Sequence, residues 1–149
     1  MKSSKQIWVW IGIVVVVIIV VIALVVALSP KPAVRPMPVF ASQGQLTPSF
    51  PKELVIDSNS QISNSYSINY DASTSQYTAE WVSSSSLPAV YNDYKTYLVN
   101  NGWTITNSSN VTAASKLGVL YAATSSAKVS VTLISQGTGS DVSVTYVGQ

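Results

Sequence analysis

Residues 87–103 read LPAVYNDYKTYLVNNGW, and this stretch decides the fold class. Its apolar and aromatic residues recur at intervals of three and four, which is the stripe of an amphipathic helix. The stripe consists of Leu87, Val90, Tyr91, Tyr94, Tyr97 and Leu98. Serines before it can cap a helix, Pro88 suits the first turn, and Gly102 supplies a left-handed residue past the end. The stretch therefore predicts one helix between residues 87 and 101, with one apolar face to bury.

On both sides of this helix, short segments alternate apolar and polar residues with period two, which is typical of strands. The segments are residues 54–57, 66–70, 77–81, 103–105, 117–123, 129–133 and 142–146. Short turns rich in Gly, Ser, Asn and Asp separate most of them, as in antiparallel hairpins. We expect an α+β domain in which the helix packs on an antiparallel sheet of about six or seven strands. The expected order, beyond the brief first run, is two strands, the helix and four strands.

The N-terminal residues 7–28 are uncharged and almost entirely apolar. At ~1.5 Å rise per residue, a helix of this length reaches about 33 Å, enough to cross a hydrocarbon core of ~30 Å. A cleaved signal peptide is the alternative, but its apolar core is usually only ~7–15 residues long. We therefore expect a retained transmembrane helix over residues 7–28, with the lipid bilayer as its partner.

The orientation of this span follows from its flanks and from the rest of the chain. Lys2 and Lys5 precede the span, whereas Lys31 and Arg35 follow it, so the positive-inside rule favours a cytoplasmic N-terminus only slightly. The remainder has no Cys, carries little charge and is rich in Ser and Thr, as secreted domains are. Six of the seven prolines fall between residues 30 and 51, which is typical of an extended spacer. The expected single-pass cell-membrane protein has a cytoplasmic tail over residues 1–6, the transmembrane helix over 7–28, a Pro-rich extracytoplasmic linker over 29–50 and an extracytoplasmic α+β domain over 51–149.

Four residues around the end of the predicted helix, Tyr94, Leu98, Gly102 and Trp103, form a Tyr-x3-Leu-x3-Gly-Trp motif. With the proline-led start of the domain, this motif resembles small bacterial and archaeal envelope domains that hang from a lipid or a membrane helix. The resemblance covers residues 51–149 and implies a hairpin, a helix and further strands outside the membrane. It implies no activity, because the motif is a packing signature and these families are of undetermined function. Many members carry a lipidated N-terminal Cys, which this chain lacks.

The composition excludes several kinds of chemistry. The chain has no Cys and no His, so thiol catalysis, imidazole acid–base catalysis and the usual zinc ligands are absent. Ser-x-x-Lys at 125–128, Tyr-x3-Lys at 91–95 and Gly-Thr-Gly at 137–139 each lack the companion motifs or structural setting that their chemistry needs. From residue 51 on, four lysines stand against six acidic residues, a net charge of −2, so we expect no nucleic-acid partner. We expect no catalytic residue, no cofactor and no metal.

Aromatic side chains are the remaining candidates for ligand contact. Their ordinary role is core packing and amphipathic cover, and the functional alternative is a platform for a sugar or a protein. Tyr97 is a candidate contact because it lies at the edge of the helical stripe. Trp81 is a second candidate, and Glu80, beside it on the opposite and polar face of the same strand, is the third.

These observations predict a non-enzymatic, membrane-anchored binding or accessory protein at the cell surface. Its partner would be another envelope protein or a polysaccharide. The alternative is a pilin-like filament subunit, although residues 5–7 read Lys-Gln-Ile where such precursors usually carry Gly or Ala before the hydrophobic helix. A hydrolase that relies on carboxylates, or on Ser and Lys, is a third alternative.

Overall fold

The structure is a computed structural model, and it describes residues 36–148. The expected tail over 1–6, the span over 7–28 and the first part of the expected linker lie outside the described residues. Between residues 36 and 148, no helix has both the length and the apolar character needed to cross a membrane. The described residues belong to a compact unit that begins at Pro36, earlier than the expected domain start at residue 51.

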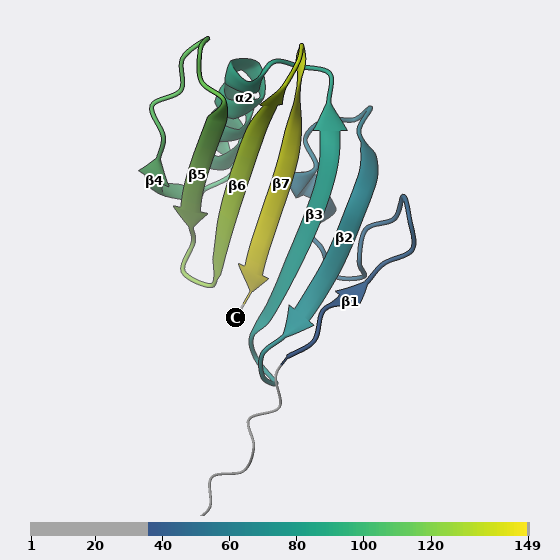
Figure 1. Cartoon of the computed structure of the whole chain (residues 1–149). Helices are drawn as coiled ribbons and strands as arrows, with labels where there is room; N and C mark the ends of the chain where they lie inside the picture. Colours follow the sequence, from purple (N-terminus) through teal and green to yellow (C-terminus); the bar gives the residue numbers. More distant parts are fainter. Residues whose placement is uncertain (1–35, 149) are drawn as a thin grey trace, which may run out of the picture. The chain divides into compact units, whose positions relative to one another are not determined.

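One antiparallel sheet of seven strands and one α-helix make up the described part of the chain (Figure 1). The elements in chain order are β1 (Val39–Phe40), the 3-10 helix η1 (Lys52–Leu54), β2 (Gln61–Asn69), β3 (Ser75–Ser83), α2 (Leu87–Asn100), β4 (Thr104–Ser108), β5 (Leu117–Ala123), β6 (Ala127–Gln136) and β7 (Gly139–Gly148). The strand order across the sheet is β1-β2-β3-β7-β6-β5-β4. The α+β class and the single helix on an antiparallel sheet are therefore confirmed. β7, the last strand in the chain, lies between β3 and β6.

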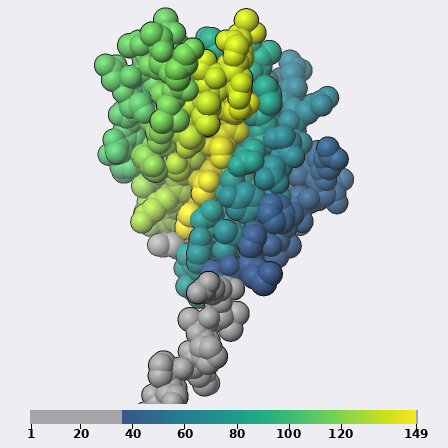
Figure 2. Space-filling view, viewed as in Figure 1, coloured from purple at the N-terminus to yellow at the C-terminus, as the bar shows by residue number. Residues whose placement is uncertain are grey.

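The two faces of the sheet differ because its strands alternate. One face is buried, and its core residues include Ala79, Trp81, Leu120, Ala122, Val129, Val131, Leu133, Val142 and Val144. The opposite face, which we call the open face, is the one seen in Figure 2, with yellow β7 running through its middle. Hydroxyl side chains occupy its centre, where Thr78 Oγ1 and Thr145 Oγ1 lie 3.1 Å apart. The sheet therefore has one side packed on the core and one side turned to solvent.

Helix α2 begins and ends close to the residues that the sequence predicts. Pro88 lies in its first turn, and Ser86 is the N-cap residue, although the Ser86 side chain makes no capping hydrogen bond. At the other end, Gly102 has a φ of 79°. The Trp103 N–H donates to the Leu98 carbonyl at 2.9 Å, and the Gly102 N–H donates to the Val99 carbonyl at 3.2 Å. This is a Schellman end, so the glycine-terminated helix is confirmed.

Two features before β2 differ from the sequence-based expectation. The strand expected over residues 54–57 is wrong, because Lys52–Leu54 form η1 and Leu54 is inserted into the core. Residues 36–50, the described part of the linker expected over 29–50, contribute to the domain, since they contain the edge strand β1 and the buried Phe50. A strand of two residues is too short to show a period of two, which is why alternation does not reveal β1.

Two separate covers protect the buried face of the sheet. Helix α2 lies against β4, β5, β6 and β7. The segment between β1 and β2 forms the second cover, since its Leu46, Phe50 and Leu54 belong to or pack against the core. Over β2, the Thr47 N–H donates to Ser65 Oγ at 3.0 Å. The two covers meet along a seam beside α2, and the largest pocket discussed below lies at this seam.

Candidate functional site

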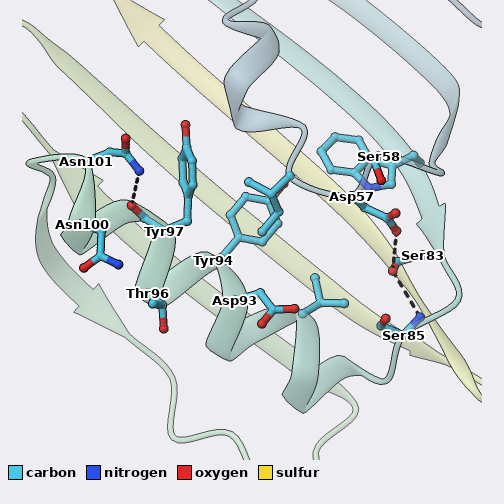
Figure 3. Close-up of a pocket in the computed structure, with 13 residues that line it drawn as sticks. Asp57, Ser58, Ser83, Ser85, Asp93, Tyr94, Thr96, Tyr97, Asn100 and Asn101 are labelled. Carbon is cyan, nitrogen blue, oxygen red and sulfur yellow. Dashed lines mark hydrogen bonds between the residues drawn. The ribbon is translucent and has the colours of Figure 1, made fainter.

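A pocket with a volume of about 530 Å³ lies between α2 and the residues that follow η1 (Figure 3). We call it the α2 pocket. Its lining consists of Ile56, Asp57, Ser58, Trp81, Ser83, Ser85, Val90, Asp93, Tyr94, Thr96, Tyr97, Asn100 and Asn101. The volume falls within the ~300–1,000 Å³ that small-molecule sites usually occupy. Figure 3 shows Asp57 and Ser83 at one end of the α2 pocket and Tyr97 with Asn101 at the other.

Asp57 is held in place by its neighbours at one end of the pocket. The Ser83 hydroxyl donates to Asp57 Oδ2 at 2.9 Å, and the Asn59 N–H donates to Asp57 Oδ1 at 3.1 Å. Ser83 Oγ in turn accepts the Ser85 N–H at 3.2 Å. Each carboxylate oxygen has two acceptor lone pairs, so both oxygens keep capacity for a ligand hydroxyl or amine. The carboxylate is therefore oriented and still available.

Helix periodicity places the residues at the other end. Thr96, Tyr97 and Asn100 come three, four and seven residues after Asp93, which puts the four on one side of the helix. Tyr97 is half-buried against the core. Burial, and then the negative charge of Glu53, raise the pKa of the Tyr97 hydroxyl, so this group stays protonated at neutral pH and can both donate and accept hydrogen bonds. This end of the pocket thus offers an aromatic ring beside an acid, a hydroxyl and an amide.

Trp81 on β3 lies in the wall of the pocket and carries an unusual buried group. The residue is only 1% exposed, and its Nε1 is buried without a hydrogen-bond partner among the described residues. Leaving a buried donor unpaired costs about 1–3 kcal/mol, so such groups are rare in native proteins. Because Nε1 itself is buried, Trp81 contributes to the pocket wall and not a donor that a ligand can reach.

The electrostatic character of the pocket is acidic. Its lining contains the carboxylates of Asp57 and Asp93 and no Lys or Arg. Such a lining disfavours phosphates and carboxylates and accepts neutral or cationic groups. Two carboxylates are fewer than a metal site usually needs. Across residues 36–148, no group of three or more acidic side chains gathers to hold a metal ion.

The three candidate contacts predicted from the sequence do not gather at one place. Trp81 and Tyr97 both line the α2 pocket. Glu80 lies on the open face, where Asn64 Nδ2 donates to Glu80 Oε2 at 3.2 Å. There Glu80 lines a second depression of about 350 Å³, whose lining also includes Val82 and part of Trp81.

Sequence reasoning missed the polar residues of the α2 pocket. Asp93 and Asn100 could have been found from their helical spacing to Tyr97. Asp57 carries no such signal, because its position depends on Ser83, which is 26 residues away in the sequence.

The Tyr-x3-Lys, Ser-x-x-Lys and Gly-Thr-Gly motifs lie in a packed helix face and in turns. Tyr91 is buried, and its hydroxyl donates to the Ser109 carbonyl at 2.6 Å, so it anchors the loop after β4. Ser125 and Ser126 lie in the turn between β5 and β6, and Gly137 lies in the turn between β6 and β7. None of these positions borders the α2 pocket.

In comparisons with protein-family models, curated proteins and solved structures, no match to this chain was found.

Proposed function

We propose that the chain is a non-enzymatic, membrane-anchored binding protein whose domain lies outside the cell membrane and takes its ligand in the α2 pocket. The α2 pocket is the observation that carries this proposal. It combines an oriented carboxylate, a half-buried aromatic ring and two amide side chains in one cavity. The anchor and the outside location rest on the apolar residues 7–28 and on the composition of the rest of the chain.

The burial and the hydrogen bonds of Ser83 support binding over catalysis. A serine nucleophile needs an exposed oxygen and a base that removes its proton. Ser83 is only 2% exposed, and its oxygen already donates to Asp57 and accepts the Ser85 N–H. Asp57 therefore orients the Ser83 hydroxyl as part of the fold, and the oxygen has no room to attack a substrate.

One observation favours a second candidate function, a carboxylate-dependent hydrolase. Asp57 and Asp93 line the same pocket. Most glycosidases use two carboxyl groups that flank the scissile bond. Exchange of each for Asn separates the two functions, because a hydrolase loses turnover while a binding protein has no turnover to lose.

Site-specific photo-crosslinking of the full chain in its native membrane tests the proposal. A benzophenone amino acid replaces Thr96, which is exposed at the rim of the α2 pocket, or Tyr70, which is exposed in the region of the β2–β3 turn. We expect a discrete adduct from position 96 that disappears when Tyr97→Ala is added, and no such adduct from position 70. The same products from both positions, or none from either, would contradict ligand binding in the α2 pocket.

A further inference from the structure

The lining of the α2 pocket restricts the class of ligand that it can take. We infer that this pocket binds an uncharged saccharide, an inference that rests on the binding function proposed above. Charge gives the first restriction. Asp57 and Asp93 face the pocket without any basic residue in the lining, so an anionic sugar or a phosphate would be repelled.

Hydrogen-bonding capacity gives the second restriction. A carboxylate such as Asp57 only accepts hydrogen bonds, whereas the exposed amides of Asn100 and Asn101 each offer N–H donors as well as an acceptor. The hydroxyl of a saccharide both donates and accepts, so one ligand can serve the carboxylate and the amide donors. An organic ammonium ion brings donors and no acceptor, and it would leave the amide N–H groups without a partner on the ligand. The amide donors in the lining therefore favour a saccharide over an amine.

Aromatic surface gives the third restriction. Tyr97 is half-buried in the pocket wall, and the buried Tyr94 lines the same pocket. A pyranose ring presents an apolar C–H face, which packs on an aromatic ring, and polar edges, which bond to surrounding side chains. Asn100 and Asn101 supply amides at the same end of the pocket as Tyr97, where those edges would lie (Figure 3).

The unit that begins at Pro36 contains the whole core cluster, so residues 36–149 can be studied alone. This part of the chain has two tryptophans, Trp81 and Trp103, which give two indole N–H signals in a nitrogen-15 NMR spectrum. Trp103 does not line the α2 pocket, and Trp103→Phe assigns the two signals. The titration probes are maltotriose, mannotriose and chitotriose, with butylammonium chloride and inorganic phosphate as charged controls.

At least one neutral trisaccharide should shift the Trp81 indole signal and leave the Trp103 signal in place. The shift should not depend on ionic strength, because an uncharged ligand makes no screened charge pair. Inorganic phosphate should leave both signals unchanged.

Variants locate the binding in the pocket. Tyr97→Ala should weaken saccharide affinity about tenfold, because the packing surface of the ring is lost. Tyr97→Leu keeps an apolar side chain packed on the core. It allows saccharide affinity to be measured without the aromatic ring if the Ala variant unfolds. Tyr121→Ala is the matched control, since Tyr121 is 46% exposed on the open face and its loss should leave affinity unchanged.

The outcomes separate this inference from the proposed function. If no trisaccharide moves the Trp81 signal, or if butylammonium alone does, the saccharide inference is overturned, while the crosslinks at position 96 still decide whether the pocket binds a ligand. If a bound trisaccharide is recovered cleaved, the saccharide inference holds and the non-enzymatic part of the proposed function is overturned.

Discussion

The phenolic hydroxyl of Tyr94 donates a 2.6 Å hydrogen bond to the main-chain carbonyl of Leu54, 40 residues earlier in the chain. Both residues are buried. Tyr94 belongs to α2 and Leu54 to η1, so this bond joins the two covers of the sheet. It lies beside the α2 pocket, which Tyr94 lines, and it therefore contributes to the distance between the pocket walls.

Exchange of Tyr94 for Phe should destabilise the domain. The variant keeps the ring but leaves the buried Leu54 carbonyl without its donor, which costs about 1–3 kcal/mol. Urea denaturation of residues 36–149 measures the free energy of unfolding. Tyr121→Phe, which removes an exposed hydroxyl on the open face, is the control and should change it little. Equal stability of the Tyr94→Phe variant and the wild type would show that the bond contributes nothing.

Tyr94 should also make the domain sensitive to alkaline pH. Burial raises the pKa of Tyr94 above its ordinary value of 10.0. Because the folded-state pKa is the higher one, this stabilisation is complete below pH 10 and is lost progressively as the pH rises above 10. The free energy of unfolding, measured at rising pH, should therefore fall more steeply for the wild type than for Tyr94→Phe. If the free energy of unfolding fell equally with pH in both proteins, Tyr94 would not be a buried phenol with a raised pKa.

Exchange of Gly139 for Ala should destabilise the start of β7. A Cβ atom at Gly139 would collide with the main-chain carbonyl oxygen of Ser83, which is fixed in β3. Overpacking of this kind costs about 1–3 kcal/mol. Thr138→Ala, in the exposed turn beside it, is the matched control and should be neutral. A shift of the thermal midpoint in the control as large as in Gly139→Ala would rule out the collision as the cause.

Asp71 should titrate at unusually low pH. Hydrogen bonds from the main chain and side chain of Ser73, and from the Thr74 N–H, lower the pKa of Asp71. The contribution of these bonds is present above the ordinary carboxyl value of 3.8 and is lost as the pH falls through the lower folded-state pKa. A pH titration by NMR should show the Ser73 and Thr74 amide signals moving below pH 3.8. Movement centred at or above 3.8 would mean that the turn bonds do not form in solution.

The absence of Cys from the chain makes the membrane topology directly testable. Single-cysteine variants Ser4→Cys and Thr138→Cys place one thiol in the expected cytoplasmic tail and one in the exposed β6–β7 turn. In intact cells, a membrane-impermeant maleimide should label position 138, and it should label position 4 only after permeabilisation. The wild type provides an unlabelled background, and the reverse labelling pattern would contradict the proposed orientation.

Local periodicity was sufficient to predict α2 and the hairpins, because their burial alternates within a few residues. It was insufficient for Leu54, because the apolar residues that follow Leu54 match the pattern of a strand. In the structure the Leu54 carbonyl instead accepts a hydrogen bond from the distant Tyr94. Tyr97 could be chosen from its place at the edge of the helical stripe. Asp57 could not, since its partner Ser83 becomes a neighbour only when the two covers close over the sheet. Local features of the site were thus predictable, and features that depend on contacts between covers were not.

The position of β7 in the centre of the sheet has a consequence for biosynthesis. β7 pairs with β3 on one side and with β6 on the other, and it is the last of the described strands to be translated. The two halves of the sheet have no common hydrogen-bonded edge until residues 139–148 have left the ribosome. Such a sheet cannot close during synthesis. This is compatible with the proposed location of the domain outside the membrane, because a sheet that closed early would have to be unfolded again before it could cross.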